Sequence, residues 1–191
     1  MNPITLFQNW FAEAVEASSA SIPSACCLST LGLDGYPNAR FVSLKGIYQD
    51  QLIITGPMDA RKGQELKKHP KASLSFWWPE VEKQVRIQGD VTPLPLEMAE
   101  ALFGKRNLAS KLVNTLFKQG DISESLEKME QILAEKLAQV QNQEISKPEA
   151  WGGILIQPIR IELMAFQTSR LHHRNLYYIK DGIWHHTLLQ P

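Results

Sequence analysis

The sequence predicts a mainly β protein with peripheral helices (α+β), built around an antiparallel β-barrel. Short segments rich in β-branched residues follow one another between turn signals such as Asp34-Gly35 and Asp181-Gly182. About seven such strands come in hairpin order rather than alternating with helices, which favours an antiparallel barrel over a doubly wound sheet. The 191 residues contain no linker or internal repeat, so we expect one domain over residues 1–191.

The first half of the chain changes from a helical to a strand-like hydrophobic period. Asn2 followed by Pro3 predicts the start of an amphipathic helix over residues 3–18. A short helix over 60–69 is expected to be capped by Asp59 and ended by Pro70. Strands are expected over residues 25–31, 38–47, 51–56, 71–78 and 82–91.

The second half begins with helices and returns to strands. Helical spacing covers residues 95–118, and Asp121 with Glu124 resembles a capping box that starts a long helix. Leu126, Met129, Leu133, Leu137 and Val140 form one apolar stripe on that helix. Pro148 interrupts the helical pattern, and the remaining strands are expected over 151–166, 175–179 and 182–189.

Composition excludes several classes of function. Lys and Arg total 20 and Asp and Glu total 20, so the chain lacks the excess positive charge that general nucleic-acid binding needs. No apolar stretch approaches the roughly 20 residues that span a bilayer, and the N-terminus lacks the features of a signal peptide. Cys26 and Cys27 are adjacent and offer no disulfide framework. We therefore expect a cytoplasmic protein that binds neither nucleic acid nor membrane.

Cations interrupt the apolar pattern of the strand expected over 38–47. Alternation places Arg40, Val42 and Leu44 on one face, and Phe41, Ser43 and Lys45 on the other. An unpaired buried cation is costly, so each is expected to meet an anion. The pattern leaves open whether that anion is a carboxylate of the protein or a ligand.

Two more cationic groups lie outside this strand. Arg61 and Lys62 fall in the first turn of a helix, where the dipole favours an anion rather than two cations. In the segment Arg170–Arg174, an extended backbone would place Arg170, His172 and Arg174 on one face. Together with Arg40 and Lys45, these groups indicate a pocket for phosphate or another anion. His185 and His186 lack neighbouring Cys, Asp or Glu at ligand spacing, so no metal site is expected.

This combination of residues resembles the pyridoxamine 5′-phosphate oxidase family of FMN-binding split barrels. The resemblance extends from about residue 5 to the C-terminus, and its separate motifs occur in the family's order and spacing. The motifs are RFVSLK (40–45), ARKGQEL (60–66), Trp78 with Gln84, Val85 and Gly89, WGG from Trp151, and RLHHR (170–174). The resemblance implies an antiparallel split barrel, FMN as cofactor and a homodimer with flavin sites at the interface.

The resemblance also implies roles for individual residues. The positions that match flavin contacts are Arg40, Phe41, Val42, Ser43, Leu44, Lys45, Thr55, Gly56, Arg61, Lys62, Gln84, Gln119, Gly120, Met164 and Arg174. Those that match substrate contacts are Lys45, Arg106, Ser110, Arg170 and His172, of which Arg170 and His172 would be catalytic. In family members, some flavin contacts, such as those matched by Gln84 and Gln119, often come from the partner subunit.

The chain departs from the family pattern in the substrate half of the site and on the flavin's edge. Leu102 stands where a tyrosine is usual, Met164 where a tryptophan is usual, and Gly120 where a serine is common. Losing one hydroxyl that binds phosphate costs on the order of 1–3 kcal/mol. Lys105, about one helical turn from Leu102, is expected to compensate with its charge. The chain also begins at the first helix, without the segment that covers the substrate in relatives.

Three functions follow from the resemblance and these departures. The first is oxidation of pyridoxamine or pyridoxine 5′-phosphate to pyridoxal 5′-phosphate, a step of vitamin B6 metabolism, with O2 as acceptor. The second keeps FMN and acts on another substrate, as the phenazine-type members of the superfamily do. The third is a non-catalytic protein, either one that binds flavin or a flavin-free barrel.

Overall fold

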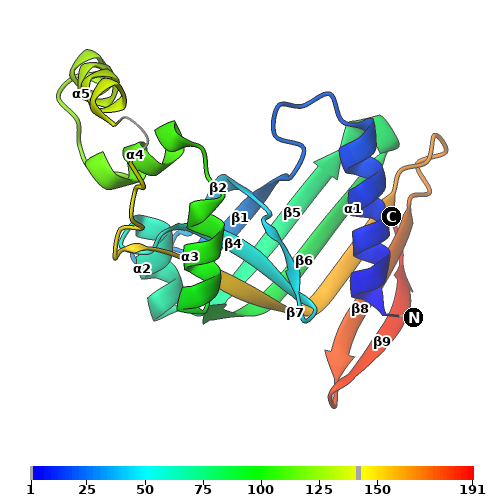
Figure 1. Ribbon diagram of the computed structural model, residues 1–191. Coiled ribbons are helices and arrows are strands. Elements are labelled where there is room, and N and C mark those ends of the chain that lie inside the picture. The colour runs from blue at the N-terminus through cyan, green and yellow to red at the C-terminus, as the bar shows by residue number, and fades with distance from the viewer. Residues whose placement is uncertain (1, 141–142) are drawn as a thin grey trace. The chain divides into compact units, whose positions relative to one another are not determined.

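The computed structural model describes residues 2–140 and 143–191. In it, nine strands form one curled antiparallel sheet, a half-barrel (Figure 1). The strands are β1 (Ala25–Leu31), β2 (Pro37–Ser43), β3 (Gly46–Tyr48), β4 (Gln51–Pro57), β5 (Lys71–Trp78), β6 (Lys83–Pro93), β7 (Trp151–Ala165), β8 (His173–Lys180) and β9 (Ile183–Leu189). Their order in the sheet is β2-β1-β5-β6-β7-β4-β3, and β8 pairs with both β7 and β9. The expected fold class is confirmed.

Five α-helices and one short 3-10 turn complete the described structure. They are α1 (Pro3–Ala17), α2 (Arg61–Lys68), α3 (Leu96–Gly104), α4 (Leu108–Leu116), α5 (Leu126–Gln139) and the turn η1 (Pro79–Val81). No helix in the described ranges is long and apolar enough to cross a membrane.

The described residues group into two compact units, each assembled from separate stretches of chain. Unit 1 comprises Met1–Ile54, Glu65–Thr92 and Leu155–Pro191, and unit 2 comprises Thr55–Gln64 and Pro93–Ile154. Because the chain runs from one unit to the other more than once, neither unit is a continuous segment. The expectation of a single domain over residues 1–191 stays a prediction.

Helix α1 covers part of the sheet in unit 1 through aromatic packing. The Asn2 side chain accepts a hydrogen bond from the Ile4 N–H at 2.9 Å, which confirms the expected N-cap. Phe7 is fully buried, with its ring centroid 5.1 Å from that of Phe76 on β5. This aromatic cluster holds the inner face of β5 against α1, so the outer face of the strand is available to other contacts.

The strand expected over residues 38–47 is two strands, and this prediction was wrong in its extent. Strand β2 ends at Ser43, and the Leu44 N–H donates to Ser24 O at 2.9 Å. The next N–H, that of Lys45, donates to Ile53 O at 2.9 Å, beside β4. The backbone thus exchanges one strand partner for another at this point, so the predicted alternation of faces does not continue through Lys45.

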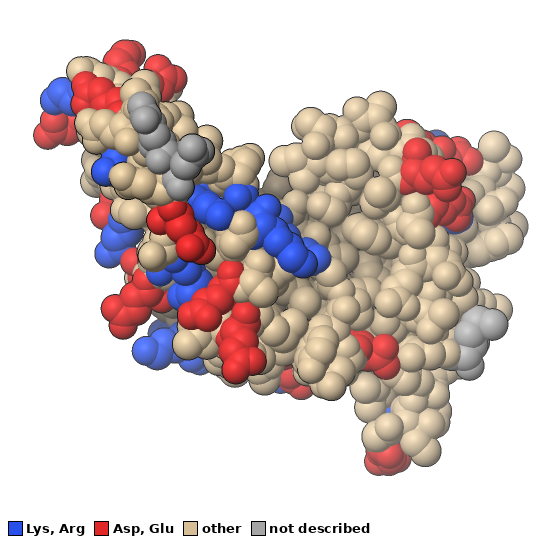
Figure 2. Space-filling model, in the orientation of Figure 1, with Lys and Arg blue, Asp and Glu red and all other residues tan. Residues whose placement is uncertain are grey.

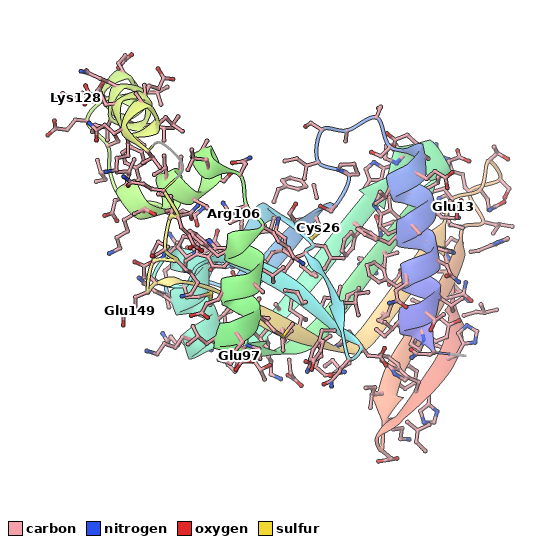
Figure 3. The ribbon with its side chains drawn as sticks, viewed as in Figure 1. Glu13, Cys26, Glu97, Arg106, Lys128 and Glu149 are labelled. Atoms are coloured by element: carbon pink, nitrogen blue, oxygen red, sulfur yellow. The ribbon has the colours of Figure 1, made fainter. Side chains whose placement is uncertain are left out.

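The helix expected over residues 95–118 is also divided. Helix α3 ends at Gly104, and Asn107 caps α4 by accepting a hydrogen bond from the Ser110 N–H at 2.8 Å. A side chain that caps a helix needs non-helical backbone at its own residue, so the helix is interrupted there. The break places Arg106 in the corner between α3 and α4 instead of on a helix face (Figure 3).

The expected capping box of Asp121 and Glu124 was wrong. Ser125 is the N-cap of α5, and its hydroxyl accepts from the Lys128 N–H at 3.2 Å. Glu124 instead pairs with Lys128 at 3.2 Å. The apolar stripe exists, but none of the residues within α5 is buried.

The two histidines of β9 have aromatic partners. His186 stacks on Tyr177 with ring centroids 4.6 Å apart, and His185 stacks on Tyr178 at 5.6 Å. Both pairs join β8 to β9 across the hairpin, whose turn is Asp181-Gly182 as expected. Within the described ranges, no group of three or more His, Cys, Asp or Glu side chains could hold a metal ion.

Candidate functional site

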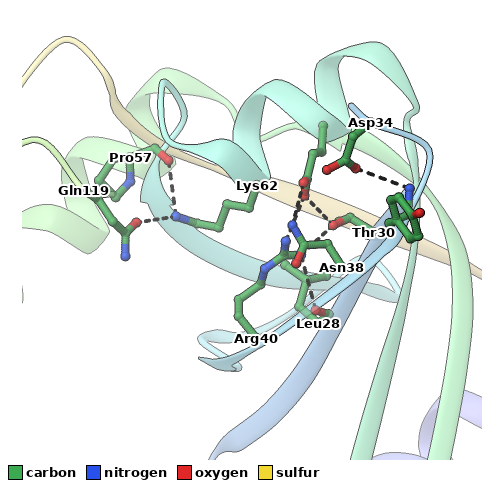
Figure 4. Close-up of polar contacts among 10 residues, drawn as sticks. Leu28, Thr30, Asp34, Asn38, Arg40, Pro57, Lys62 and Gln119 are labelled. Atoms are coloured by element: carbon green, nitrogen blue, oxygen red, sulfur yellow. Dashed lines mark hydrogen bonds and ion pairs between the residues drawn. The ribbon is translucent and has the colours of Figure 1, made fainter. Parts of the chain in front are cut away.

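Arg40 lies in a buried polar network of unit 1 that centres on Glu65 (Figure 4). The Arg40 Nη2 donates to Glu65 Oε2 at 2.8 Å, and the Arg40 Nη1 donates to Thr30 Oγ1 at 2.5 Å. Thr30 Oγ1 donates to the same carboxylate at 2.6 Å, and Asn38 Nδ2 donates to Glu65 Oε1 at 2.8 Å. The Glu65 side chain is 0% exposed, so these donors replace the water that its charge would otherwise need.

The anion expected beside Arg40 is therefore a carboxylate of the protein. Sequence reasoning left this alternative open but did not identify Glu65. The sequence did contain a feature that could have identified it, because Glu65 is the only acidic residue in the helix Arg61–Lys68. Glu65 joins helix α2, which carries Arg61 and Lys62 in its first turn, to strands β1 and β2.

Lys62 donates hydrogen bonds to two neutral oxygen atoms of unit 2 (Figure 4). Its Nζ donates to Gln119 Oε1 at 2.7 Å and to Pro57 O at 3.3 Å. The structure thus brings together Lys62 and Gln119, two predicted flavin contacts that are 57 residues apart in the sequence. Both of these acceptors are uncharged oxygen atoms.

Two glycines allow the backbone to pack closely around the start of α2. A Cβ on Gly63 would lie 2.0 Å from Met58 O, so no other residue fits there without a backbone shift. At Gly56, a Cβ would lie 3.1 Å from Lys62 Nζ and crowd the ammonium group. The loop before the helix is thereby held close to its first turn. This arrangement of backbone N–H groups and cations fits a phosphate group.

Asp59 does not cap α2 as expected. Its Oδ1 is buried and accepts no hydrogen bond within the described part of the chain. The first turn is closed instead by the Gly63 and Gln64 N–H groups, which both donate to Ala60 O, at 2.8 and 3.1 Å. The first turn of α2 is therefore held by its own backbone rather than by the Asp59 side chain.

Arg106 and Ser110 lie together at the corner between α3 and α4 in unit 2. Arg106 Nη2 donates to Ser110 O at 3.4 Å, and the guanidinium carbon lies 5.5 Å from the ring centroid of Trp151. The Arg106 Nε is buried without a hydrogen-bond partner among the described residues. Burial lowers the pKa of Arg106, which shows that its charge is poorly solvated. An anionic ligand would offset that cost.

The Arg170–Arg174 segment is not extended throughout, contrary to the expectation that Arg170, His172 and Arg174 share one strand face. Arg170 has φ +66°, and its N–H donates to Gln167 O at 3.0 Å in a tight turn. Strand β8 begins only at His173. A left-handed backbone at a non-glycine residue costs about 1 kcal/mol or more, and such residues are concentrated at functional sites.

The His172 ring is fixed by one hydrogen bond and by packing. Its Nδ1 accepts a hydrogen bond from the Gln167 N–H at 3.1 Å, which puts the proton of the neutral ring on Nε2. Its centroid lies 4.8 Å from that of Phe166, which in turn lies 4.8 Å from Trp77. The Nε2 group has no partner within the described residues and can therefore donate to a ligand.

His172 and Arg174 line a pocket of about 460 Å³ in unit 1. The other lining residues are Leu171, His173, Asn175, Leu188, Leu189 and Pro191. One wall is thus formed by residues 171–175, and the other by Leu188 and Leu189 of β9 with Pro191. The pocket combines a cation, an imidazole and leucine side chains, a lining that suits a polar aromatic ligand.

Arg174 also belongs to a charged cluster with Arg86 and Glu162. Glu162 is 4% exposed, and its two oxygens accept hydrogen bonds from Arg174 Nε at 2.9 Å and from Arg86 Nη2. Burial alone would raise the pKa of Glu162, but the hydrogen bonds and charges of Arg86 and Arg174 outweigh it and hold the pKa below its ordinary value. Glu162 is a further residue that sequence reasoning missed.

The lowered pKa of Glu162 predicts a pH-dependent contribution to stability. A carboxyl group whose pKa is lower in the folded state stabilises the fold above its unfolded pKa of about 4.3, and loses this contribution as pH falls through the folded value. We therefore expect the wild type to melt at a higher temperature than Glu162→Gln, and we expect this difference to be largest near pH 7. The difference should shrink below about pH 4 in thermal melts of both proteins; a constant difference would contradict this assignment.

The surroundings of Cys26 do not make it a candidate nucleophile. Burial, together with the neighbouring Cys27, raises the pKa of Cys26 to about 12, and the hydrogen bond with the Leu44 backbone offsets only part of this. Its thiolate, the reactive form, is therefore scarce at neutral pH. Cys26 and Cys27 are both free thiols.

The predicted site residues fall in both units. Unit 1 holds Arg40, Phe41, Val42, Ser43, Leu44, Lys45, Gln84, Met164, Arg170, His172 and Arg174, and unit 2 holds Thr55, Gly56, Arg61, Lys62, Arg106, Ser110, Gln119 and Gly120. Met164 lies directly opposite Arg174 in the β7–β8 ladder. On the face seen in Figure 2, Lys and Arg side chains are interspersed with Asp and Glu side chains.

Sequence comparison assigns almost the whole chain to known families. Residues 13–144 match the family described as pyridoxamine 5′-phosphate oxidase, and residues 151–191 match the pyridoxine 5′-phosphate oxidase C-terminal dimerisation region. A pyridoxine/pyridoxamine 5′-phosphate oxidase of Acaryochloris marina is 38% identical over 190 residues, covering 100% of this chain and 86% of the relative. One of Pseudomonas paraeruginosa is 34% identical over 191 residues, covering 100% and 89%.

Solved structures give the same result. PhzG from Burkholderia lata 383, in complex with tetrahydrophenazine-1-carboxylic acid, has a TM-score of 0.92 and 28% identity, covering 100% of this chain and 93% of that one. An FMN-binding protein of Nostoc punctiforme has a TM-score of 0.79 at 17% identity and supports the fold. The expected family, its oxidoreductase class and its cofactor FMN are confirmed, and the dimerisation region supports the expected homodimer. The chain belongs to the pyridoxamine 5′-phosphate oxidase family.

Proposed function

We propose that the protein is an FMN-dependent oxidase that converts pyridoxamine or pyridoxine 5′-phosphate to pyridoxal 5′-phosphate, with O2 as the electron acceptor. FMN, when bound, would supply the redox chemistry by which a hydride from C4′ of the substrate, with one proton, reduces O2 to hydrogen peroxide. Pyridoxine 5′-phosphate would give the aldehyde directly, whereas pyridoxamine 5′-phosphate would give an imine that water hydrolyses with release of ammonia. The protein supplies binding, orientation and charge. Full-length similarity to oxidases of this substrate class supports the proposal.

The observation that carries the proposal is that unit 2 has two separate cationic groups. Arg61 and Lys62 lie in the first turn of α2, and Arg106 lies in the corner between α3 and α4. An oxidase that combines a phosphorylated cofactor with a phosphorylated substrate needs two phosphate sites. We assign the first group to the phosphate of FMN and the second, with the Ser110 hydroxyl, to the phosphate of the substrate.

The remaining contacts follow the family pattern. Thr55, Gly56, Gln84, Gln119, Gly120, Met164 and Arg174 would contact the flavin together with residues 40–45, and Lys45 would also reach the substrate phosphate. Because Glu65 holds the Arg40 guanidinium, Arg40 would also support the flavin site by fixing β2 against α2. A homodimer would bring the partner's Gln84 and Gln119 to the flavin.

Arg170 and His172 are assigned to the substrate ring. His172 is held at Nδ1, so its Nε2–H can donate a hydrogen bond to a polar substituent of the ring. Arg170 adds a positive charge from a turn with left-handed backbone. Their role is orientation and electrostatic stabilisation over the flavin rather than nucleophilic attack.

Peroxide release tests the proposal. Purified protein loaded with FMN should release hydrogen peroxide at a steady rate when pyridoxamine or pyridoxine 5′-phosphate is added in air. The unphosphorylated vitamers serve as matched controls and should react far more slowly, because they lack the group that Arg106 would bind. No peroxide from flavin-loaded protein with either phosphate ester would contradict the proposed substrate.

A second candidate keeps FMN and changes the substrate. Leu102 and Met164 replace a tyrosine and a tryptophan of the family pattern, and both replacements remove polar groups, the first from the expected substrate half and the second from the flavin's edge. PhzG, a structural neighbour with a TM-score of 0.92, is bound to tetrahydrophenazine-1-carboxylic acid, so we consider such ring systems as the alternative substrate class. Anaerobic bleaching of the flavin, recorded for vitamer phosphates and reduced phenazine carboxylic acids in parallel, separates the two candidates. A flavin that no compound bleaches would indicate a non-catalytic flavin-binding protein.

The phosphate site has one further proposed member. Lys105 is exposed at the C-terminal end of α3, and its charge could replace the hydroxyl missing at Leu102. Lys105→Ala should then raise the KM for a phosphorylated substrate, and an unchanged KM would remove Lys105 from the site. The cytoplasm remains the proposed location of the enzyme.

A further inference from the structure

Glu162 bridges two strands that carry predicted flavin contacts. It lies on β7, and its carboxylate accepts hydrogen bonds from Arg86 on β6 and from Arg174 on β8. Gln84 is two residues before Arg86 and therefore on the same face of β6. One buried carboxylate thus fixes both strands next to the residues expected to touch the flavin.

The Arg174 guanidinium is held at all three of its nitrogens. Nε and Nη2 each lie 2.9 Å from Glu162 Oε1, and Nη1 donates to Gln190 O at 2.9 Å. The side chain is 23% exposed and lines the pocket that also includes His172. Arginine has a flexible side chain, so three fixed nitrogens select a single orientation at this pocket.

The charge of the cluster also favours a role beyond stability. Two arginines and one carboxylate leave a net charge of +1 beside the pocket. Buried ion pairs contribute little net stability, because the cost of desolvation cancels most of the attraction, and apolar residues of similar volume often serve as well. An apolar side chain cannot orient a cation toward a ligand. A role in ligand binding therefore explains the carboxylate at this position better than a contribution to stability does.

We propose that Glu162 is a positioning residue for the flavin: it orients Arg174 toward the cofactor, and the Gln190 carbonyl acts as the second support. The proposal rests on the proposed function, which assigns Arg174 to the flavin. Arg86 donates to the opposite oxygen of Glu162, so the contacts of Arg174 with Oε1 are separate from it.

A double-mutant cycle on FMN affinity tests this inference. Apoprotein is titrated with FMN, and quenching of flavin fluorescence gives the dissociation constant for wild type, Glu162→Gln, Arg174→Gln and the double variant. We expect each single variant to raise the dissociation constant about tenfold or more, as for loss of a charge-assisted hydrogen bond. The double variant should bind no more weakly than Arg174→Gln alone, because Glu162 acts through Arg174.

Arg86→Gln is the matched control for a purely structural role. It breaks the same cluster from the other side but leaves the contacts between Glu162 and Arg174 in place. We expect Arg86→Gln to change the FMN dissociation constant less than about threefold, even if it melts at a lower temperature. Apoprotein melting temperatures of all variants identify any that is unfolded, and Glu162→Asp replaces Glu162→Gln in that case.

Several outcomes would overturn the inference. The first is that the effects of Glu162→Gln and Arg174→Gln on the FMN dissociation constant add in the double variant. The others are an equal loss of FMN affinity in Arg86→Gln and Glu162→Gln, and an unchanged FMN affinity in Glu162→Gln. If Arg174→Gln has no effect while the wild type binds FMN, Arg174 is not a flavin contact and the inference fails alone. A wild-type protein that takes up no FMN would contradict the proposed function as well.

Discussion

Glu65→Ala is expected to destabilise the protein by about 3 kcal/mol, since removing one partner of a buried ion pair costs about 3–5 kcal/mol. The lower end of this range applies because Arg40 remains 22% exposed and water can reach it. The variant would leave Arg40, Thr30 and Asn38 without the acceptor they share. For a chain of this length, we expect a decrease in melting temperature of about 6–12 °C.

Asp90→Ala is the control for this prediction. Asp90 pairs with Lys71 at 2.7 Å, but the two side chains are 53% and 77% exposed, so water screens the pair. Such pairs contribute about 0–1 kcal/mol, and we expect the melting temperature to change by less than about 2 °C. Thermal denaturation of the three apoproteins, followed by circular dichroism, measures both values. Equal shifts in the two variants would mean that the Glu65 network stabilises no more than a surface pair.

His172→Ala is expected to have the largest effect on the reaction. If the imidazole orients the substrate over the flavin, its loss should lower kcat/KM by about 10²-fold, as for misplacement of a reactant by about 1 Å. The FMN content should not change, because His172 is assigned to the substrate only. Steady-state peroxide release at saturating O2, with the FMN content determined from the absorption spectrum, measures the two quantities separately.

His173→Ala is the adjacent control, because His173 is exposed and lines the same pocket but is assigned no contact with substrate or cofactor. We expect its kcat/KM to stay within about twofold of the wild type. A loss of activity in both variants would indicate a general disturbance of the turn before β8. Full activity in His172→Ala would exclude His172 from the catalytic site.

The fold was predictable where short-range signals determine the structure. Asn2 and Pro3 start α1, and the turns at Asp34-Gly35 and Asp181-Gly182 separate strands as expected. The breaks at Ser43 and Asn107 were missed for a physical reason. At Ser43, backbone hydrogen bonds with residues far along the chain change the strand partner, and at Asn107 one side-chain cap outweighs the helical spacing on both sides.

The candidate site was predictable in its cations but not in the residues that hold them. Arg40 and Arg174 break their local patterns and are therefore conspicuous in the sequence. Their partners Glu65 and Glu162 are ordinary acidic residues, and only the folded chain brings them to Arg40 and Arg174. The same is true of the contact between Lys62 and Gln119, which are 57 residues apart. Sequence spacing carries no information on such long-range pairs.

The central claim is that Arg61 and Lys62, at the start of α2, bind the phosphate of the flavin. Equilibrium titration of the apoprotein with FMN and with riboflavin, which lacks only this phosphate, tests the claim most directly. We predict that the wild type binds FMN at least about 10²-fold more tightly than riboflavin, and that the double variant Arg61→Gln/Lys62→Gln loses most of this preference. Equal affinities in the wild type, or an unchanged preference in the variant, would contradict it.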